Sequence, residues 1–261
     1  MRRSGPALRR PEPGAFCIAR LRATRQIRGM RRFPVPVASQ PFRVPLLLFS
    51  LLLLSSVAAH ADGAPGDGDL LGKPEFAGWE LVSKERADIK AVCTPLGAGV
   101  YAVSGNPVGY LATVASHKNF QLHAEYRWPA DAPKNANSGV LIHIASGPID
   151  RGTWPQCFQV QTKMGRAGDV LPMAGARFAE PLSTPPDART QQLDRRNPSS
   201  EKPLGEWNVL EVTCKDGSIL ITVNGVEQNR VTGCVPLEGR IGFQLEGTPF
   251  ELRSVWLKPL K

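Results

Sequence analysis

The chain has 261 residues and a formal net charge of +9, with 42% hydrophobic and 21% charged side chains. The basic excess is confined to the N-terminus. Residues 1–61 hold eleven arginines and one acidic residue, Glu12, which leaves 21 basic and 22 acidic side chains for residues 62–261. Residues 62–261 therefore lack the excess of positive charge that would favour binding to nucleic acid or to an anionic membrane.

The first predicted element is a secretory signal peptide over residues 1–61. An apolar run from Val44 to Leu54 follows an arginine-rich region and leads into small residues, with Ala59-His60-Ala61 as the cleavage site. The run is short for a transmembrane helix, so we expect cleavage after Ala61 and export to the periplasm or beyond, with an uncleaved anchor as the alternative. Because the basic region is long, translation from Met30 is a further hypothesis.

Residues 62–75 are rich in Gly, Pro and Asp, which predicts a flexible leader. A single domain is therefore expected over residues 76–261, long enough to bury a sizeable core. Its first short strands are predicted at Val100–Val103 and Tyr110–Thr113, on either side of the turn Gly105-Asn106-Pro107.

Alternation of apolar and polar residues predicts the next two strands. Phe120–Trp128 alternates clearly and places Arg127 on its polar face. In Ser138–Ile144 the same pattern places Ile144 inward and His143 outward. Both strands are thus expected to bury one face only.

A further strand, Trp154–Gln161, directs Gln159 and Gln161 outward. The pattern then breaks between Gly165 and Gly205, where six prolines interrupt the chain. Because such long irregular connections are uncommon in compact domains and often functional, this segment is expected to form one wall of a site, a solvated excursion being the alternative.

The C-terminal third predicts four more strands. They are Trp207–Cys214, Ile219–Val223, Ile241–Leu245 and Phe250–Leu257. Gln244 and Glu246 alternate with buried positions and form a polar row. With no long amphipathic helix after residue 61, the fold class is all-β, a two-sheet antiparallel sandwich.

Four cysteines follow the predicted cleavage site: Cys93, Cys157, Cys214 and Cys234. Export permits disulfides, and Cys214 and Cys234 lie in adjacent predicted strands, which makes them the first pair to test. Four buried free thiols are the alternative. The spacing contains no CxxC pair of the kind that zinc sites use.

Familiar catalytic motifs are absent from the sequence, including GxSxG, HExxH, the phosphate-binding loop and the dinucleotide fingerprint. What remains is a set of outward polar side chains: Glu125, Arg127, His143, Gln159, Gln161, Gln244 and Glu246. Such groups can hydrogen-bond sugar hydroxyls, and Trp128, Trp154 or Trp207 could stack on a pyranose ring. Each residue alone has a simpler structural explanation, because an outward glutamine on a strand is usually just solvated and a tryptophan usually belongs to the core.

A set of short segments stands out by its order and spacing: Asn137–His143, Trp154-Pro155, Val160-Gln161, Gly165–Asp169, Glu201–Pro203, Gly205–Asn208, Val223–Gly225 and Gly239–Gly247. In these segments the chain resembles the 3-keto-disaccharide hydrolase domain family (DUF1080). The resemblance extends from about Phe76 to Leu260. It implies a concanavalin A-like jelly roll and action on sugars oxidised at C3.

The implied chemistry follows from the ketone. A C3 carbonyl acidifies the C2 proton, so a base can remove it and the glycosidic oxygen can leave from C1, after which water adds. The resemblance thus implies His143, Glu246 and Asp169 as catalytic residues, and the same three as candidate ligands of a divalent metal that would polarise the ketone. Asp169 could instead be a turn residue after Gly168.

Arg127, Gln159, Gln161, Gln244 and Trp154 are the predicted substrate-binding residues. Gln159 occupies a position where many relatives carry glutamate, and an amide can neither accept the proton nor bind a cation with charge. An exported, non-catalytic carbohydrate-binding module is therefore the alternative function. Neither the glycan nor the oligomeric state follows from the pattern.

Overall fold

The structure is a computed structural model that describes residues 69–71 and 76–261. The predicted signal peptide and most of the predicted leader lie outside the described residues. Within the leader range, Leu71 is only 5% exposed and the Leu70 amide donates to the Val255 carbonyl at 2.8 Å. This segment therefore already packs on the domain. No helix in the described ranges is long and apolar enough to cross a membrane.

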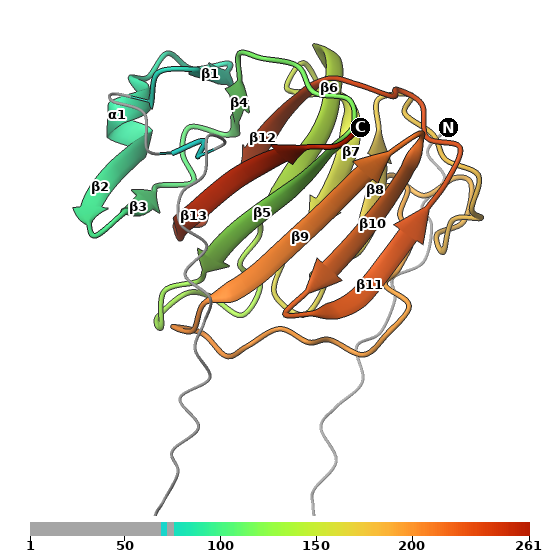
Figure 1. The fold of residues 1–261 in the computed structure, drawn as a ribbon. Coiled ribbons are helices and arrows are strands. Elements are labelled where there is room, and N and C mark those ends of the chain that lie inside the picture. Colours follow the sequence, from blue (N-terminus) through green and yellow to red (C-terminus); the bar gives the residue numbers. More distant parts are fainter. Residues whose placement is uncertain (1–68, 72–75) are drawn as a thin grey trace, which may run out of the picture. The chain divides into compact units, whose positions relative to one another are not determined.

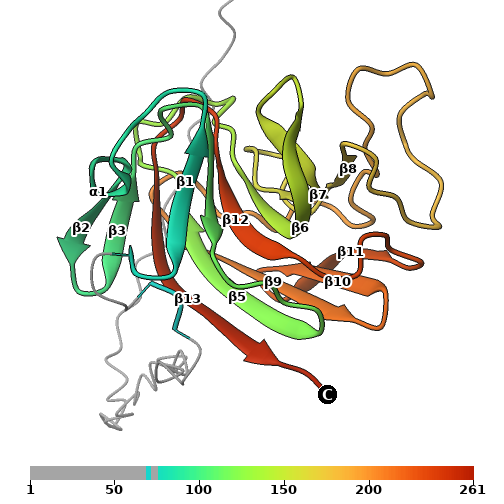
Figure 2. The ribbon, with the colours of Figure 1, turned by 90° about the horizontal axis from the view of Figure 1, so that it is seen from above.

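Two antiparallel sheets form the domain, as predicted (Figures 1 and 2). In spatial order, the six-stranded sheet contains β1 (Trp79–Ser83), β4 (Gly109–Thr113), β12 (Arg240–Leu245), β6 (Gly139–Asp150), β7 (Trp154–Gln161) and β8 (Val170–Met173).

The seven-stranded sheet covers the other side of the core. In spatial order it contains β11 (Val226–Val231), β10 (Ser218–Val223), β9 (Asn208–Lys215), β5 (Phe120–Arg127), β13 (Phe250–Pro259), β3 (Val100–Val103) and β2 (Cys93–Gly97). The described residues contain one short α-helix, α1 (Ile89–Val92), which precedes β2, and the Asp88 side chain caps it by accepting from the Lys90 backbone amide.

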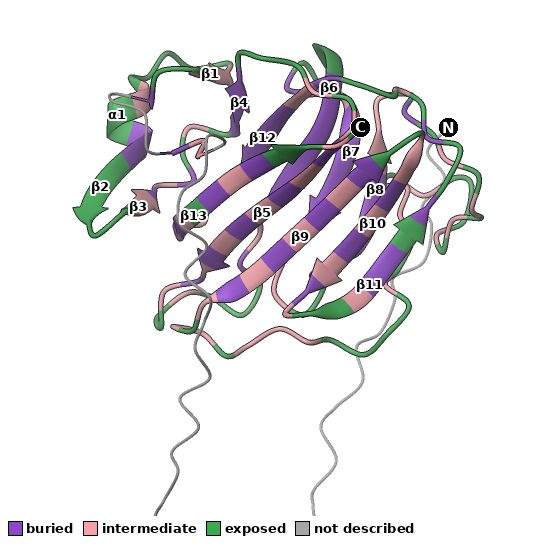
Figure 3. Ribbon diagram, viewed as in Figure 1, coloured by how far each residue is buried: buried purple, intermediate pink, exposed green. Residues whose placement is uncertain are grey.

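Alternating burial along the strands produces the core between the sheets. In β5 every second residue is buried, and β9 repeats the pattern, which Figure 3 shows as alternating bands. Phe120 and Leu122 of β5 pack in one cluster with Phe158 and Ile241 of the facing sheet. Each fully buried side chain of this size stabilises the fold by about 1.5–3 kcal/mol.

A β-bulge in β6 overturns the predicted orientation of His143. Leu141 pairs with Gly242 and Ile144 with Arg240, so two residues of β6 oppose one of β12. His143 adopts a φ of 53°, and its ring packs against the core ring of Phe120 with centroids 5.7 Å apart. The alternation shifts by one residue there, so His143 points inward and Ile144 joins an outer cluster.

The prediction that Arg127 shares one polar face with Gln159 and Gln244 is also wrong. Arg127 belongs to β5, in the sheet opposite the one that carries Gln159 and Gln244. Its guanidinium pairs with Glu251 at 2.6 Å and lies 4.6 Å from the centre of the Trp207 ring. The polar rows expected to form one face are therefore divided between two sheets.

All four cysteines of the described chain are buried free thiols, so the first-choice pair Cys214–Cys234 is not bonded. Burial raises the pKa of Cys93 and of Cys234 to about 12. These thiols stay protonated at neutral pH and act as small apolar core groups.

Candidate functional site

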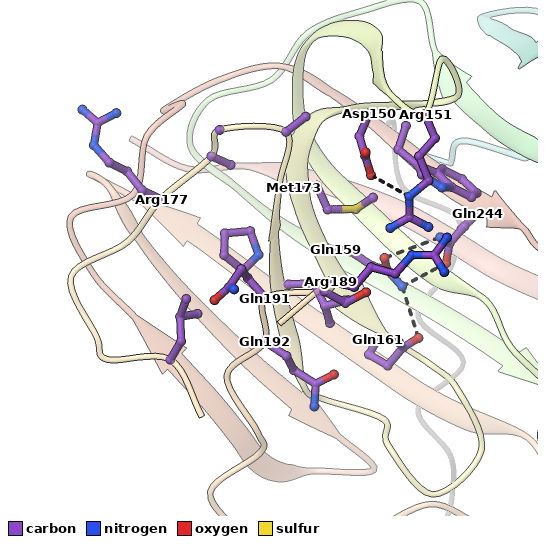
Figure 4. Close-up of a pocket in the computed structure, with 18 of the residues that line it drawn as sticks. Asp150, Arg151, Gln159, Gln161, Met173, Arg177, Arg189, Gln191, Gln192 and Gln244 are labelled. Atoms are coloured by element: carbon purple, nitrogen blue, oxygen red, sulfur yellow. Dashed lines mark hydrogen bonds and ion pairs between the residues drawn. The ribbon is translucent and has the colours of Figure 1, made fainter. Parts of the chain in front are cut away.

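A pocket of about 1110 Å³ opens on the outer face of the six-stranded sheet (Figure 4). Its floor comes from β7 and β12, one side comes from the hairpin between β6 and β7, and the opposite wall comes from β8 and residues 174–192. The irregular segment after Gly165 thus provides a site wall, as its length and prolines predicted.

Three amide side chains form the floor of the pocket. Gln159 Nε2 donates to Gln244 Oε1 at 2.9 Å and to Gln161 Oε1 at 3.2 Å, as the dashed lines in Figure 4 show. Gln161 and Gln159 alternate on β7, and Gln244 lies two strands away on β12, with Gly139 of β6 between them. A β-carbon at Gly139 would lie 2.8 Å from the Gln159 amide, so this glycine makes room for the cluster.

Glu246 lies beside this floor, immediately after the end of β12. Asn137 lies two residues before β6, and its side-chain amide Nδ2 donates to Glu246 Oε2. Burial raises the pKa of Glu246, and the charges of Lys163 and Arg151 lower it in part. Because antiparallel pairing brings the end of β12, the start of β6 and the end of β7 together, one half-buried carboxylate lies on the same side of the sheet as the three amides.

Asp169 does not line the pocket, but its carboxylate accepts hydrogen bonds that hold the wall segment in place. Its carboxylate is fully buried and accepts from the Arg195 amide at 2.8 Å and from Gln192 Nε2 at 3.0 Å. Arg166 Nη1 lies 3.5 Å from the same carboxylate. Val170 and Leu193 also exchange backbone hydrogen bonds, so the wall segment is tied to β8 at its base.

The predicted metal-ligand set does not converge. His143 is 2% exposed, with Nδ1 3.2 Å from the Pro236 carbonyl oxygen and Nε2 3.3 Å from that of Lys118, and burial lowers its pKa. Asp169 is occupied as described above, and only Glu246 lines the pocket. Within residues 69–71 and 76–261, no three His, Cys, Asp or Glu residues group closely enough to hold a metal ion.

Trp154 lines the pocket, although only 6% of it is exposed. It packs in the outer cluster with Tyr110, Leu141 and Ile144. Leu171, Met173, Phe178 and other apolar residues continue from it along the wall formed by β8 and the loop. The pocket therefore has a polar floor and a partly apolar side, a combination that suits the hydroxyls and C–H faces of a sugar.

Several residues that line the pocket carry no signal in the sequence. Asn137 lies in a recognised motif but carries no predicted role, and Lys163, Arg151 and Arg189 were not singled out. Arg189 belongs to the proline-rich segment, where no periodicity indicates which side chain turns inward. Lys163 and Arg151 lie just beyond the end and before the start of β7, where strand alternation stops being informative.

Comparison with solved structures supports the fold. A protein from Parabacteroides distasonis, provisionally assigned as a glycosyl hydrolase, is 19% identical over 74% of this chain and 93% of its own, with a TM-score of 0.52. A second protein from the same organism with the same provisional assignment is 14% identical over 74% and 98%, with a TM-score of 0.51. A search of curated proteins gave no match. Residues 68–258 match the family described as the 3-keto-alpha-glucoside-1,2-lyase-like domain, and the chain therefore belongs to that family.

Proposed function

We propose that this protein cleaves glycosides whose sugar carries a ketone at C3, by removing the C2 proton and eliminating the group on C1. The observation that carries the proposal is the half-buried Glu246 carboxylate, which lines the pocket next to an amide-lined floor. Membership of a family named for a 3-keto-glucoside lyase supports the same chemistry. The predicted signal peptide supports action outside the cytoplasm.

The residues of the pocket match the needs of this reaction. Glu246 would accept the C2 proton, the electron pair of that C–H bond would form the C1–C2 double bond, and the C1–O bond would break with its pair on the leaving oxygen. That oxygen then takes a proton from water or from the protonated carboxyl group. Gln161 and Gln244 can donate to the ketone oxygen, where negative charge develops, while Gln159 uses both of its N–H groups to hold them in place. Addition of water to the unsaturated ketone would complete a hydrolysis.

The direct test is release of an aromatic aglycone from a 3-keto-glucoside, compared with the same glucoside carrying a C3 hydroxyl. We expect release from the ketone only, because the hydroxyl compound has no acidified C2 proton. Equal release from both compounds would point to ordinary glycosidase chemistry and would overturn the proposal.

The pH dependence of kcat/KM should show an acidic limb that belongs to Glu246. Protonated Glu246 cannot act as a base, so activity should rise as the pH passes upward through a pKa that lies above the ordinary value of 4.5. Since Lys163 lowers that pKa, Lys163→Met should move the limb to higher pH. Initial rates between pH 4 and 9 measure this, and a limb that stays in place in the variant would contradict the assignment to Glu246.

His143→Asn should leave catalysis largely intact. The His143 side chain lies in the core, and asparagine tolerates its positive φ. We expect kcat within about threefold of wild type, against the 10²–10⁴-fold loss typical of a removed general base. Unfolding should become easier by about 1–3 kcal/mol, because the ring contacts in the core are lost and the neutral imidazole no longer donates to the carbonyl of Pro236 or of Lys118. Thermal unfolding and single-substrate kinetics check both values.

The second candidate function is sugar binding without turnover, which the neutral amide at Gln159 favours. An amide cluster can hold hydroxyls but supplies no charge. Calorimetry that shows tight binding of 3-keto-glucosides, together with no aglycone release by the wild-type protein, would select this function.

A further inference from the structure

We infer that the substrate of this pocket carries an acidic group on its leaving unit, and that Arg189 recognises that group. The inference rests on the proposed function for the position of the oxidised sugar. The acidic group and its recognition by Arg189 are inferred from the charges and hydrogen bonds of the pocket wall.

The pocket is basic in a domain that is otherwise balanced in charge. Eight charged residues line it: Arg151, Lys163, Arg166, Arg177, Arg189, Asp150, Glu180 and Glu246. Arg151 pairs with Asp150, and Arg166 pairs with Asp194 and Asp169. Lys163, Arg177 and Arg189 form no ion pair with any described residue. Residues 62–261 as a whole hold nearly equal numbers of acidic and basic side chains, so the pocket is more basic than the domain that carries it.

Arg189 is the unpaired cation that reaches across the pocket. Figure 4 draws its side chain extending from the loop wall toward the side where Gln159 and Gln244 lie, whereas Arg177 points away from them. A guanidinium presents a planar fork of donors that matches a carboxylate or sulfate. A cation facing the amide floor from the opposite wall is thus placed to contact a ligand held between the two.

The loop around Arg189 is held in a defined conformation although its side chain is exposed. Gln191 Nε2 donates to three carbonyl oxygens of the preceding turn, those of Pro185, Pro186 and Ala188, at 3.1–3.2 Å. The backbone N–H of Gln192 donates to Thr184 Oγ1 at 3.0 Å and closes the base of the turn. A loop fixed in this way presents Arg189 without the ordering cost that a free loop would carry on binding.

The charge of Glu246 decides where the acidic group lies. An anion on the oxidised ring itself would face the Glu246 carboxylate, which must be ionised to act as a base. Two negative charges brought close together in a partly buried site repel each other strongly. The acidic group therefore belongs on the unit attached through C1, on the side of the loop wall.

The test uses two synthetic 3-keto-glucosides that share one nitrophenol leaving group. One carries a carboxylate on the phenyl ring and the other carries the carboxamide of the same shape at the same position. We expect wild type to prefer the carboxylate by about tenfold in kcat/KM, mainly through KM, as for a charge-assisted hydrogen bond at a partly exposed site. The preference should shrink as salt is added.

Arg189→Gln should reduce the ratio of the two kcat/KM values to about one, and Arg189→Glu should reverse it. Arg86→Gln removes the same charge outside the pocket and should leave the ratio unchanged. A wild-type ratio near one, or a ratio that survives in Arg189→Gln, would overturn the inference.

Calorimetric binding of the same two compounds keeps this test separate from the proposed function. If neither compound releases its phenol, the proposed cleavage fails, but tighter binding of the carboxylate that depends on Arg189 would still support the inference. Equal binding of both compounds by wild type would refute it whether or not cleavage occurs.

Discussion

Glu246→Gln should lower kcat for cleavage of a 3-keto-glucoside by about 10²–10⁴-fold, the range lost when a positioned general base is removed. Glutamine has the size of glutamate and its carbonyl oxygen can still accept from Asn137, so the floor of the pocket should keep its shape. Binding of the sugar, measured by calorimetry, should therefore change only a few-fold. A large loss in kcat with retained binding is the signature of a group that acts in the transition state.

Glu180→Gln is the matched control, because Glu180 also lines the pocket but is occupied by Thr232, whose amide and hydroxyl donate to it at 2.9 Å. We expect its kcat to stay within about threefold of wild type, since it is placed to hold structure and not to accept a proton. If Glu246→Gln and Glu180→Gln reduce kcat equally, charge in the pocket matters in general and Glu246 is not the base.

Asp169→Ala should destabilise the domain by about 2–4 kcal/mol, since it leaves buried donors without an acceptor. The amide of Arg195 and the side chain of Gln192 both lose their partner, and the wall of the pocket loses its attachment. Because Gln192 ends the loop that carries Arg189, KM should rise as well. Denaturant unfolding and steady-state kinetics measure the two effects.

Two further variants separate an anchoring role from a catalytic one. Asp194→Ala removes a half-exposed partner of the same Arg166 and should cost less than about 1 kcal/mol. Asp169→Asn retains an oxygen for the Arg195 amide and should keep most of the activity. If Asp169→Asn unfolds like wild type yet loses more than about 100-fold in kcat, Asp169 takes part in the chemistry and the anchoring account is wrong.

The strands that alternation predicted are those flanked by other strands. Interior strands such as β5 and β9 bury one full face, which imposes a period of two on the sequence. The four strands that were not predicted, β1, β2, β8 and β11, are the four edge strands of the two sheets. An edge strand pairs on one side only and buries less, so its sequence carries a weaker pattern.

The floor of the site was predictable because Gln159, Gln161, Gln244 and Glu246 follow strand alternation directly. The errors come from features that a local pattern does not encode. Whether β5 belongs to one sheet or the other depends on its pairing with β9 and β13, which are distant in the sequence. Because β5 lies in the seven-stranded sheet, Arg127 lies away from the site. The bulge at His143 depends on the register of β6 against β12. The loop wall lacks periodicity, so its existence could be predicted but Arg189 could not.

The central claim, that this pocket removes the C2 proton of a 3-keto-glycoside, is tested most directly with a substrate that carries deuterium at C2. We expect wild type to release the aglycone more slowly from the deuterated compound, with the deuterium passing to solvent at the same rate as the aglycone appears. An incubation without protein corrects for spontaneous exchange beside the ketone, and Glu246→Gln should show neither event above it. Release of the aglycone at an unchanged rate, with deuterium retained at C2 of the sugar product, would contradict the account.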